Sequence, residues 1–79
     1  MKRIVYTKHA EEMLVRRNLK KVFVTSCLTK PDKKEHAKEN KRAYLKDFGR
    51  NYLKVIVSEE SNALVILTLY WIAKDHIKK

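Results

Sequence analysis

Five side chains of this 79-residue sequence could together act on an anionic ligand: His9, Arg17, Lys54, Thr68 and Tyr70. Histidine is the side chain that most readily exchanges a proton near neutral pH. Arginine and lysine supply fixed positive charge, and the planar fork of arginine suits phosphate oxygens best. Thr68 and Tyr70 add hydroxyls that could hydrogen-bond a phosphate or orient His9. This set predicts proton transfer beside an anion-binding surface.

Two further residues are candidates for binding rather than for proton transfer. Arg50 follows Gly49, the only glycine of the chain, and offers a second guanidinium for phosphate. Tyr52 offers an aromatic ring on which a nucleic-acid base could stack, as do Tyr70 and Trp71. The sequence therefore predicts a binding surface that extends beyond the proton-transfer residues.

The charge of the chain points to the same kind of ligand. Nineteen Lys and Arg residues against nine Asp and Glu residues give a net charge of +10. Such a charge density favours an anionic partner, which is either nucleic acid or an acidic protein. A lysine-rich surface with no specific partner is the alternative.

Metal, disulfide and nucleotide-phosphate chemistry are not indicated. The three histidines lack the spacing of metal ligands, and the single cysteine, Cys27, lacks companions for a zinc site or an internal disulfide. One glycine cannot form a glycine-rich phosphate loop. We expect no cofactor and no metal site, and we interpret Cys27 as a small buried hydrophobic residue.

The location follows from the apolar segments. The N-terminal residues lack the apolar core of a signal peptide, and the longest apolar run is about half the length that a bilayer requires. We expect a cytoplasmic protein without membrane contact that is a monomer or a homodimer when free. At 79 residues it forms one small domain, residues 1–79.

That longest apolar run, Asn62–Ala73, is the element around which the fold must be built. It is rich in β-branched and aromatic residues, which predicts a central strand over residues 63–73, buried on both faces. Thr68 and Tyr70 lie two positions apart and should point to one side. The odd-numbered residues should face the other way, towards the helices: Val65, Leu67, Leu69 and Trp71.

Two helices are predicted near the N-terminus. Thr7 is a good N-cap for a helix that runs to about Arg17, and Asn18 suits the left-handed conformation that ends a helix. The apolar stripe of this first helix is Ala10, Met13 and Leu14. A second amphipathic helix, ending near Leu28, has a stripe formed by Leu19, Val22, Phe23, Ser26 and Cys27.

The remaining segments predict strands and one loop. Strands are expected at Arg3–Tyr6, Ala43–Phe48 and Tyr52–Ser58, and residues 33–41, with a single alanine as their only apolar residue, read as a solvated loop. The expected class is α+β with two layers, a helix hairpin packed on an antiparallel sheet in the order β-α-α-β-β-β.

Several motifs occur in the order and spacing of a known group. His9 early in the first helix is followed eight residues later by Arg17, and Leu53-Lys54-Val55 and the Thr68-x-Tyr70 pattern follow in later strands. In these features the chain resembles the RelE/ParE-like toxin superfamily, and within it a small family of uncharacterised domains. Asn18 stands where that family usually has glycine.

This resemblance implies a toxin of a toxin–antitoxin pair. In the wider group many members are metal-independent endoribonucleases, often acting on ribosome-bound mRNA, and a cognate antitoxin protein blocks them. His9, Arg17, Lys54, Thr68 and Tyr70 would then be the catalytic set. Other members inhibit gyrase or are inactive, so the alternative is a non-catalytic binding module that acts on a protein target or on RNA without cleavage. A third alternative is a structural domain with a basic surface.

Each candidate residue also has a purely structural interpretation. His9 near a helix start could bond a backbone carbonyl, and Arg17 could pair with Glu11, Glu12 or a strand carbonyl. Thr68 and Tyr70 could be core residues with satisfied hydroxyls, and Lys54 could simply be exposed. The enzyme hypothesis requires His9, Arg17, Lys54 and Tyr70 to converge on one open cleft, although a helical His9 reaches the far side of the sheet only around its edge.

Overall fold

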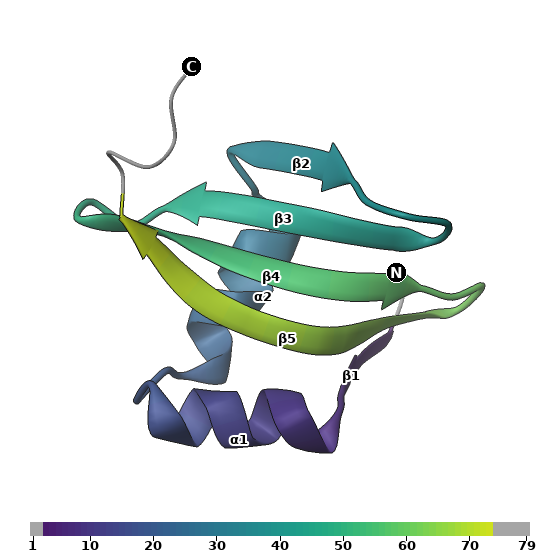
Figure 1. Ribbon diagram of the computed structural model, residues 1–79, viewed down its shortest axis with the longest axis horizontal. Helices are drawn as coiled ribbons and strands as arrows, with labels where there is room; N and C mark the ends of the chain where they lie inside the picture. Colours follow the sequence, from purple (N-terminus) through teal and green to yellow (C-terminus); the bar gives the residue numbers. More distant parts are fainter. Residues whose placement is uncertain (1–2, 74–79) are drawn as a thin grey trace.

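The computed structural model describes residues 3–73, which form two helices packed on a five-stranded sheet. The strand order is β1-β5-β4-β3-β2, with β1 parallel to β5 and every other pair antiparallel. In Figure 1, α2 crosses behind the sheet and α1 runs beside β5. The elements are β1 Arg3–Tyr6, α1 Lys8–Arg16, α2 Lys21–Thr29, β2 Lys33–His36, β3 Lys41–Asp47, β4 Asn51–Glu59 and β5 Ala63–Ala73.

The α+β class and the start of the chain agree with the sequence-based predictions. Strands β1 and β5 have the predicted bounds, and α1 ends one residue before the predicted end. Thr7 caps α1 through its side chain, which accepts a hydrogen bond from the Ala10 N–H. Asn18 has a φ of 53°, in the left-handed region that ends helices.

The sheet differs from the prediction in two respects. It is mixed rather than purely antiparallel, because β1 pairs in parallel with β5. It also has an additional edge strand, β2, within residues 33–41, which were expected to form a loop. All four residues of β2 are exposed, so the strand is held by its backbone pairing with β3 and shows no apolar alternation. Lysine-rich edge strands of this kind also resist edge-to-edge aggregation.

The second helix is rotated relative to the expected apolar stripe. It starts at Lys21, and its buried residues are Val24, Cys27 and Leu28, whereas Val22 is 63% exposed and Phe23 is 37% exposed. Leu19 is buried but precedes the helix, and its N–H bonds the Leu14 carbonyl at the end of α1. The expected stripe treated Leu19 as part of the same helix as Cys27. Because Leu19 lies outside the helix, the spacing counted from it does not give the buried face of α2.

The core lies between the helices and one face of the sheet. Leu53, Val55 and Val57 of β4 are fully buried. Ile66 and Leu69 of β5 are also fully buried. From α1 the core receives the predicted residues, Ala10, Met13 and Leu14. The opposite face, turned towards the viewer in Figure 1, is not crossed by either helix, and we call it the open face.

A β-bulge at Leu67 reverses the alternation of β5. Ile66 is opposite Val57 on β4, but Thr68 is opposite Ile56, so Leu67 is an extra residue. Ile66 and Leu69, three positions apart, therefore both face the core. The prediction that all odd residues face the helices is correct for Leu69 and Trp71 and wrong for Val65 and Leu67. Nor is β5 buried on both faces, since most of its residues are only half-buried.

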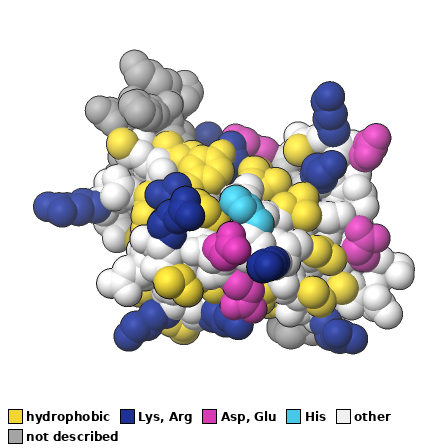
Figure 2. All heavy atoms as spheres, turned by 60° about the horizontal axis from the view of Figure 1, so that its bottom comes forward, with side chains coloured by type: hydrophobic (Ala, Val, Ile, Leu, Met, Phe, Trp, Pro, Cys, Tyr) yellow, Lys and Arg dark blue, Asp and Glu magenta, His cyan; other side chains and the backbone are white. Residues whose placement is uncertain are grey.

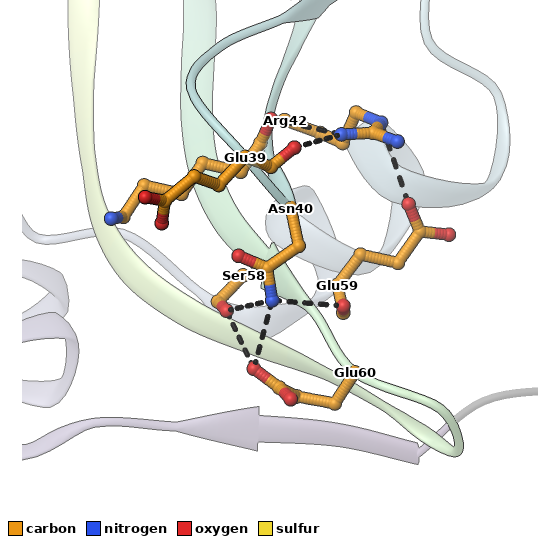
Figure 3. Close-up of polar contacts among 7 residues, drawn as sticks. Glu39, Asn40, Arg42, Ser58, Glu59 and Glu60 are labelled. Carbon is orange, nitrogen blue, oxygen red and sulfur yellow. Dashed lines mark hydrogen bonds and ion pairs between the residues drawn. The ribbon is translucent and has the colours of Figure 1, made fainter.

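A polar clamp joins the β2–β3 loop to the β4–β5 hairpin (Figure 3). The Asn40 amide nitrogen lies 3.3 Å from the Ser58 hydroxyl, 3.2 Å from the Glu59 carbonyl and 3.3 Å from the Glu60 carboxylate. The Ser58 hydroxyl also donates to the Glu60 carboxylate at 2.7 Å. Nearby, Arg42 pairs with the Glu59 carboxylate at 3.4 Å. These contacts connect the start of β3 to the end of β4 and to the turn that follows β4.

Cys27 is expected to be unreactive in the folded protein. Its Sγ is buried and donates to the carbonyls of Tyr44 and Leu53, and burial is the main reason that its pKa is raised to about 12. Because the fold favours the protonated thiol, stability from this group is full below about pH 9 and is lost as pH rises towards 12. A disulfide reagent at pH 8 should therefore label Cys27 only after urea unfolding; immediate labelling of the native protein would contradict this burial.

Candidate functional site

The start of α1 is fixed onto β5 at the point where β1 ends. Tyr6, the last residue of β1, is opposite Ile66. Thr7 then makes a double connection, because its hydroxyl donates to the Ile66 carbonyl at 2.8 Å while accepting from the Ala10 N–H at 3.1 Å. This N-cap therefore determines both where the helix begins and how it meets the edge of β5.

His9 lies two residues beyond this anchor and contacts β5. Its Nε2 is 3.2 Å from the Thr68 Oγ1, with either atom able to donate depending on the imidazole tautomer. β1 pairs with β5 only as far as Ile66, so the edge beside Thr68 is left to α1. His9 thus reaches Thr68 around the edge of the sheet, and the structural alternative, a bond to a backbone carbonyl, is not what the geometry shows.

The bulge at Leu67 places Thr68 and Tyr70 on the open face. Without the extra residue, both side chains would share the core-facing side with Ile66. On the open face, Tyr70 is opposite Lys54 and Thr68 is opposite Ile56. Directly opposed side chains in an antiparallel pair are close enough to interact. His9, Thr68, Tyr70 and Lys54 are therefore brought to one region.

Lys54 has an acidic neighbour that the sequence did not suggest. Its Nζ lies 3.9 Å from Glu35 on β2, at the outer limit of an ion pair, and the Glu35 side chain is 51% exposed. Surface pairs of this kind contribute little stability and are readily exchanged. Glu35 was missed because β2 was taken for a loop, and nothing in its charged sequence indicates that it borders the Lys54 strand.

The other predicted residues lie at the margins. Tyr52 precedes Lys54 by two positions on β4 and shares its face. Arg50 is exposed in the β3–β4 turn, and Arg17 is exposed at the C-terminal cap of α1, two helical turns beyond His9. Both segments lie towards the same end of the molecule as the C-terminus of β5 (Figure 1).

Glu11 and Glu12, which the structural alternative offered as partners of Arg17, both lie on α1. Glu11 pairs with Lys21 of α2 at 3.4 Å, and the Lys21 ammonium also lies 4.6 Å from the centre of the Tyr6 ring. Glu12 lies on the outer surface of α1, beside a shallow hollow of about 510 Å³. Glu11 therefore connects α1 to α2 through Lys21.

The candidate residues lie on an open surface. The hollow on α1 is lined by Lys8, Glu11, Glu12, Val15 and Arg16, and a second hollow lies on the helix side of the sheet. Neither includes the predicted catalytic side chains. Figure 2, which brings α1 forward, shows basic side chains around the outline and also near the histidine in the middle of this face, interspersed with acidic and hydrophobic ones. A ligand of the His9 region would lie across the sheet rather than enter a pocket.

Comparison with known proteins places the chain in a family. The profile of a domain of unknown function, DUF4258, matches residues 6–71, which is most of the chain, so the protein belongs to that family. The match includes every candidate residue from His9 to Tyr70. Comparisons with curated proteins and with solved structures found no match.

Residues 3–73 were also searched for metal-binding groups and for membrane-spanning helices. Within residues 3–73, no group of three or more histidine, cysteine or acidic side chains is arranged to hold a metal ion. Over the same residues, no helix has the length and apolar character needed to cross a membrane.

Proposed function

We propose that this domain is a RelE-like toxin, an endoribonuclease that cleaves RNA without a metal ion and is blocked by a cognate antitoxin. The observation that supports the proposal is the 3.2 Å contact between His9 Nε2 and Thr68 Oγ1, on the edge of a face that also carries Tyr70 and Lys54. A proton-transfer group held by a hydroxyl beside a cation is the minimum that such a reaction requires.

The reaction would use the RNA 2′-hydroxyl as an internal nucleophile. His9 would exchange the proton of this hydroxyl or of the 5′-oxygen leaving group, and Thr68 would orient the imidazole ring. Lys54 would stabilise the charge that develops on the phosphate, which would displace the weak contact with Glu35. Tyr70 would hydrogen-bond the phosphate or stack a base.

The charge of the chain supports RNA and antitoxin as partners. A net charge of +10 attracts RNA, and it equally attracts an acidic antitoxin segment that could cover the basic surface. Arg17, Arg50 and Tyr52 would extend the RNA-binding surface around the catalytic residues. Such a pair would operate in the cytoplasm.

A non-catalytic binding module is the second candidate, and a specific observation favours it. The enzyme hypothesis required a shared cleft, but the candidate residues lie on an open face, with Arg17 and Arg50 towards its margins. An open sheet face with tyrosines beside lysine suits binding of single-stranded RNA or of a protein as well as it suits cleavage.

Incubation of the purified chain with RNA distinguishes the two candidates. We expect cleavage of free mRNA in the presence of EDTA, or of ribosome-bound mRNA in a buffer that keeps ribosomes intact, with 2′,3′-cyclic phosphate ends that mark attack by the 2′-hydroxyl. Intact RNA under both conditions would refute the ribonuclease proposal. Intact RNA that nevertheless binds the protein in a fluorescence anisotropy assay would support the binding module.

A further inference from the structure

Two residues of β3 are buried on the open face of the sheet. Ala43 and Leu45 are only 4% and 2% exposed, yet neither belongs to the core cluster between the helices and the sheet. Strand alternation explains this, because Tyr44 between them is the residue of β3 that points into that core. Ala43 and Leu45 therefore form a small apolar surface on the open face, which we call the β3 floor.

Polar side chains of the two neighbouring strands flank the β3 floor. Lys54 of β4 and Lys33 of β2 are both directly opposite Leu45. Glu35 of β2 is directly opposite Ala43. The Lys54 Nζ lies 3.9 Å from the Glu35 carboxylate, so these two side chains approach each other across β3. An ion pair at this distance, with the Glu35 side chain 51% exposed, contributes little stability, and a ligand can readily separate it.

The two charges above the floor match the two ends of a nucleotide. Lys54 offers a cation for phosphate, whereas the ionised carboxylate of Glu35 only accepts hydrogen bonds and repels phosphate. β2 and β4 are two strand spacings apart, or about 10 Å, which is close to the distance from a phosphate to the far edge of its base. A nucleotide whose phosphate meets Lys54 can therefore lay its base on the β3 floor and present the edge of that base to Glu35.

The donor pattern of the bases selects guanine for this position. In a single strand the Watson–Crick edge of each base is free to be recognised. Guanine presents two adjacent donors there, N1–H and the N2 amino group, and a carboxylate can accept both at once. Adenine and cytosine present one amino donor beside a ring nitrogen that accepts, and uracil presents one N–H between two carbonyls. Each of those acceptors would face the carboxylate unfavourably.

We propose that the β3 floor, together with Glu35 and Lys54, is a binding subsite for a guanine nucleotide. The apolar floor contacts the base, Glu35 accepts hydrogen bonds from its Watson–Crick edge, and Lys54 leaves Glu35 to contact the phosphate. The guanine is that of a free nucleotide or of single-stranded RNA. The inference rests on the RNA-binding face of the proposed function, but it does not require cleavage. The subsite gives the open face a base preference that net charge alone does not provide.

Four single strands that cannot be cleaved test the base preference. They are fluorescein-labelled 2′-O-methyl pentanucleotides, UUGUU, UUAUU, UUCUU and UUUUU, in which the blocked 2′-hydroxyl prevents the proposed reaction. We expect the strand with guanine to bind at least about tenfold more tightly than the other three in fluorescence anisotropy at one fixed salt concentration. Equal affinities would overturn the inference, and they would leave the ribonuclease proposal to its own cleavage test.

Glu35→Gln locates the preference. The amide keeps the size of the side chain but replaces one acceptor with a donor, so the four affinities should fall within about twofold of one another. The affinity for UUUUU should not decrease, because a charge that repels phosphate has been removed. Glu12→Gln makes the same change on the outer surface of α1 and should keep the preference for guanine. A guanine preference that survives in Glu35→Gln contradicts the assignment.

Methyl NMR distinguishes the two sources of guanine. Shifts of the Ala43 and Leu45 signals on titration with guanosine 5′-monophosphate would show that the free nucleotide is sufficient. Shifts with UUGUU alone would show that a strand is needed, and either pattern supports the subsite. Adenosine 5′-monophosphate is the control and should shift both signals less. Unchanged Ala43 and Leu45 signals in both guanine titrations would place the ligand elsewhere and overturn the inference.

Discussion

Replacing His9 with alanine is expected to lower the rate of RNA cleavage by about a hundred- to ten-thousand-fold. The His9 ring contacts the Thr68 hydroxyl, and its loss removes the proton-transfer group proposed for the reaction. The rate is measured by following a labelled RNA under single-turnover conditions, so that binding and cleavage are separated.

The His9 variant should fold normally, which makes the result interpretable. His9 is exposed, and its side chain makes a surface hydrogen bond with Thr68, so the free energy of unfolding should change by no more than about 0.5 kcal/mol. Lys8→Ala, at the preceding exposed position, is the matched control and should retain cleavage close to the parent. Thr68→Val should give a smaller loss than His9→Ala, because the imidazole remains but is less well oriented. Parental activity in His9→Ala would remove His9 from the mechanism.

The second large effect concerns stability and the bulge in β5. Leu69→Ala is expected to lower the free energy of unfolding by about 2–5 kcal/mol, since Leu69 is fully buried and its truncation leaves a cavity. Leu67→Ala should cost only about 1 kcal/mol, because Leu67 is the bulged residue and lies outside the core. Urea unfolding followed by circular dichroism measures both.

This pair of variants tests the geometry that positions the candidate site. A regular strand would place Leu67 and Leu69 on the same face and make the two truncations similarly damaging. Equal losses would therefore contradict the bulge, and with it the placement of Thr68 on the open face. Small domains have total stabilities of about 5–15 kcal/mol, so the Leu69 variant should be well separated from the Leu67 variant.

The parts of the fold that the sequence predicted are those with strong local signals. Thr7 before an amphipathic segment determined the start of α1, and the β-branched and aromatic run determined β5. β2 was not predicted, because an edge strand with no buried side chains is held only by backbone hydrogen bonds. Residues 33–36 therefore show no alternation of apolar and polar side chains from which a strand could be recognised. The predicted apolar stripe of α2 was wrong because the chain leaves the helical conformation after Asn18. The residues of α2 therefore do not continue the helical spacing that starts at Leu19, and the spacing of apolar residues alone does not reveal such a break.

The sequence indicated which residue types could form the candidate site, but it indicated only part of the geometry that brings them together. The alternation rule correctly put Thr68 and Tyr70 on the side opposite Leu69, but it did not reveal the bulge that separates them from Ile66. The short length of β1 is what frees the edge of β5 for His9, and no local pattern in the sequence reports where a strand pairing stops. The pairing of Lys54 with Glu35 depends on β2 and was equally hidden.

The parallel pairing of β1 with β5 determines when the candidate site can form during synthesis of the chain. His9 and Thr68 are 59 residues apart, and the Thr7 anchor spans the same interval to Ile66. During synthesis, β1 and α1 leave the ribosome long before β5 exists, and non-local contacts of this kind form late. The hairpins among β2, β3 and β4 can close as they emerge, whereas the His9–Thr68 pair is assembled only when β5 arrives. A nascent chain therefore carries no complete candidate site, and its partners meet one only in the finished fold.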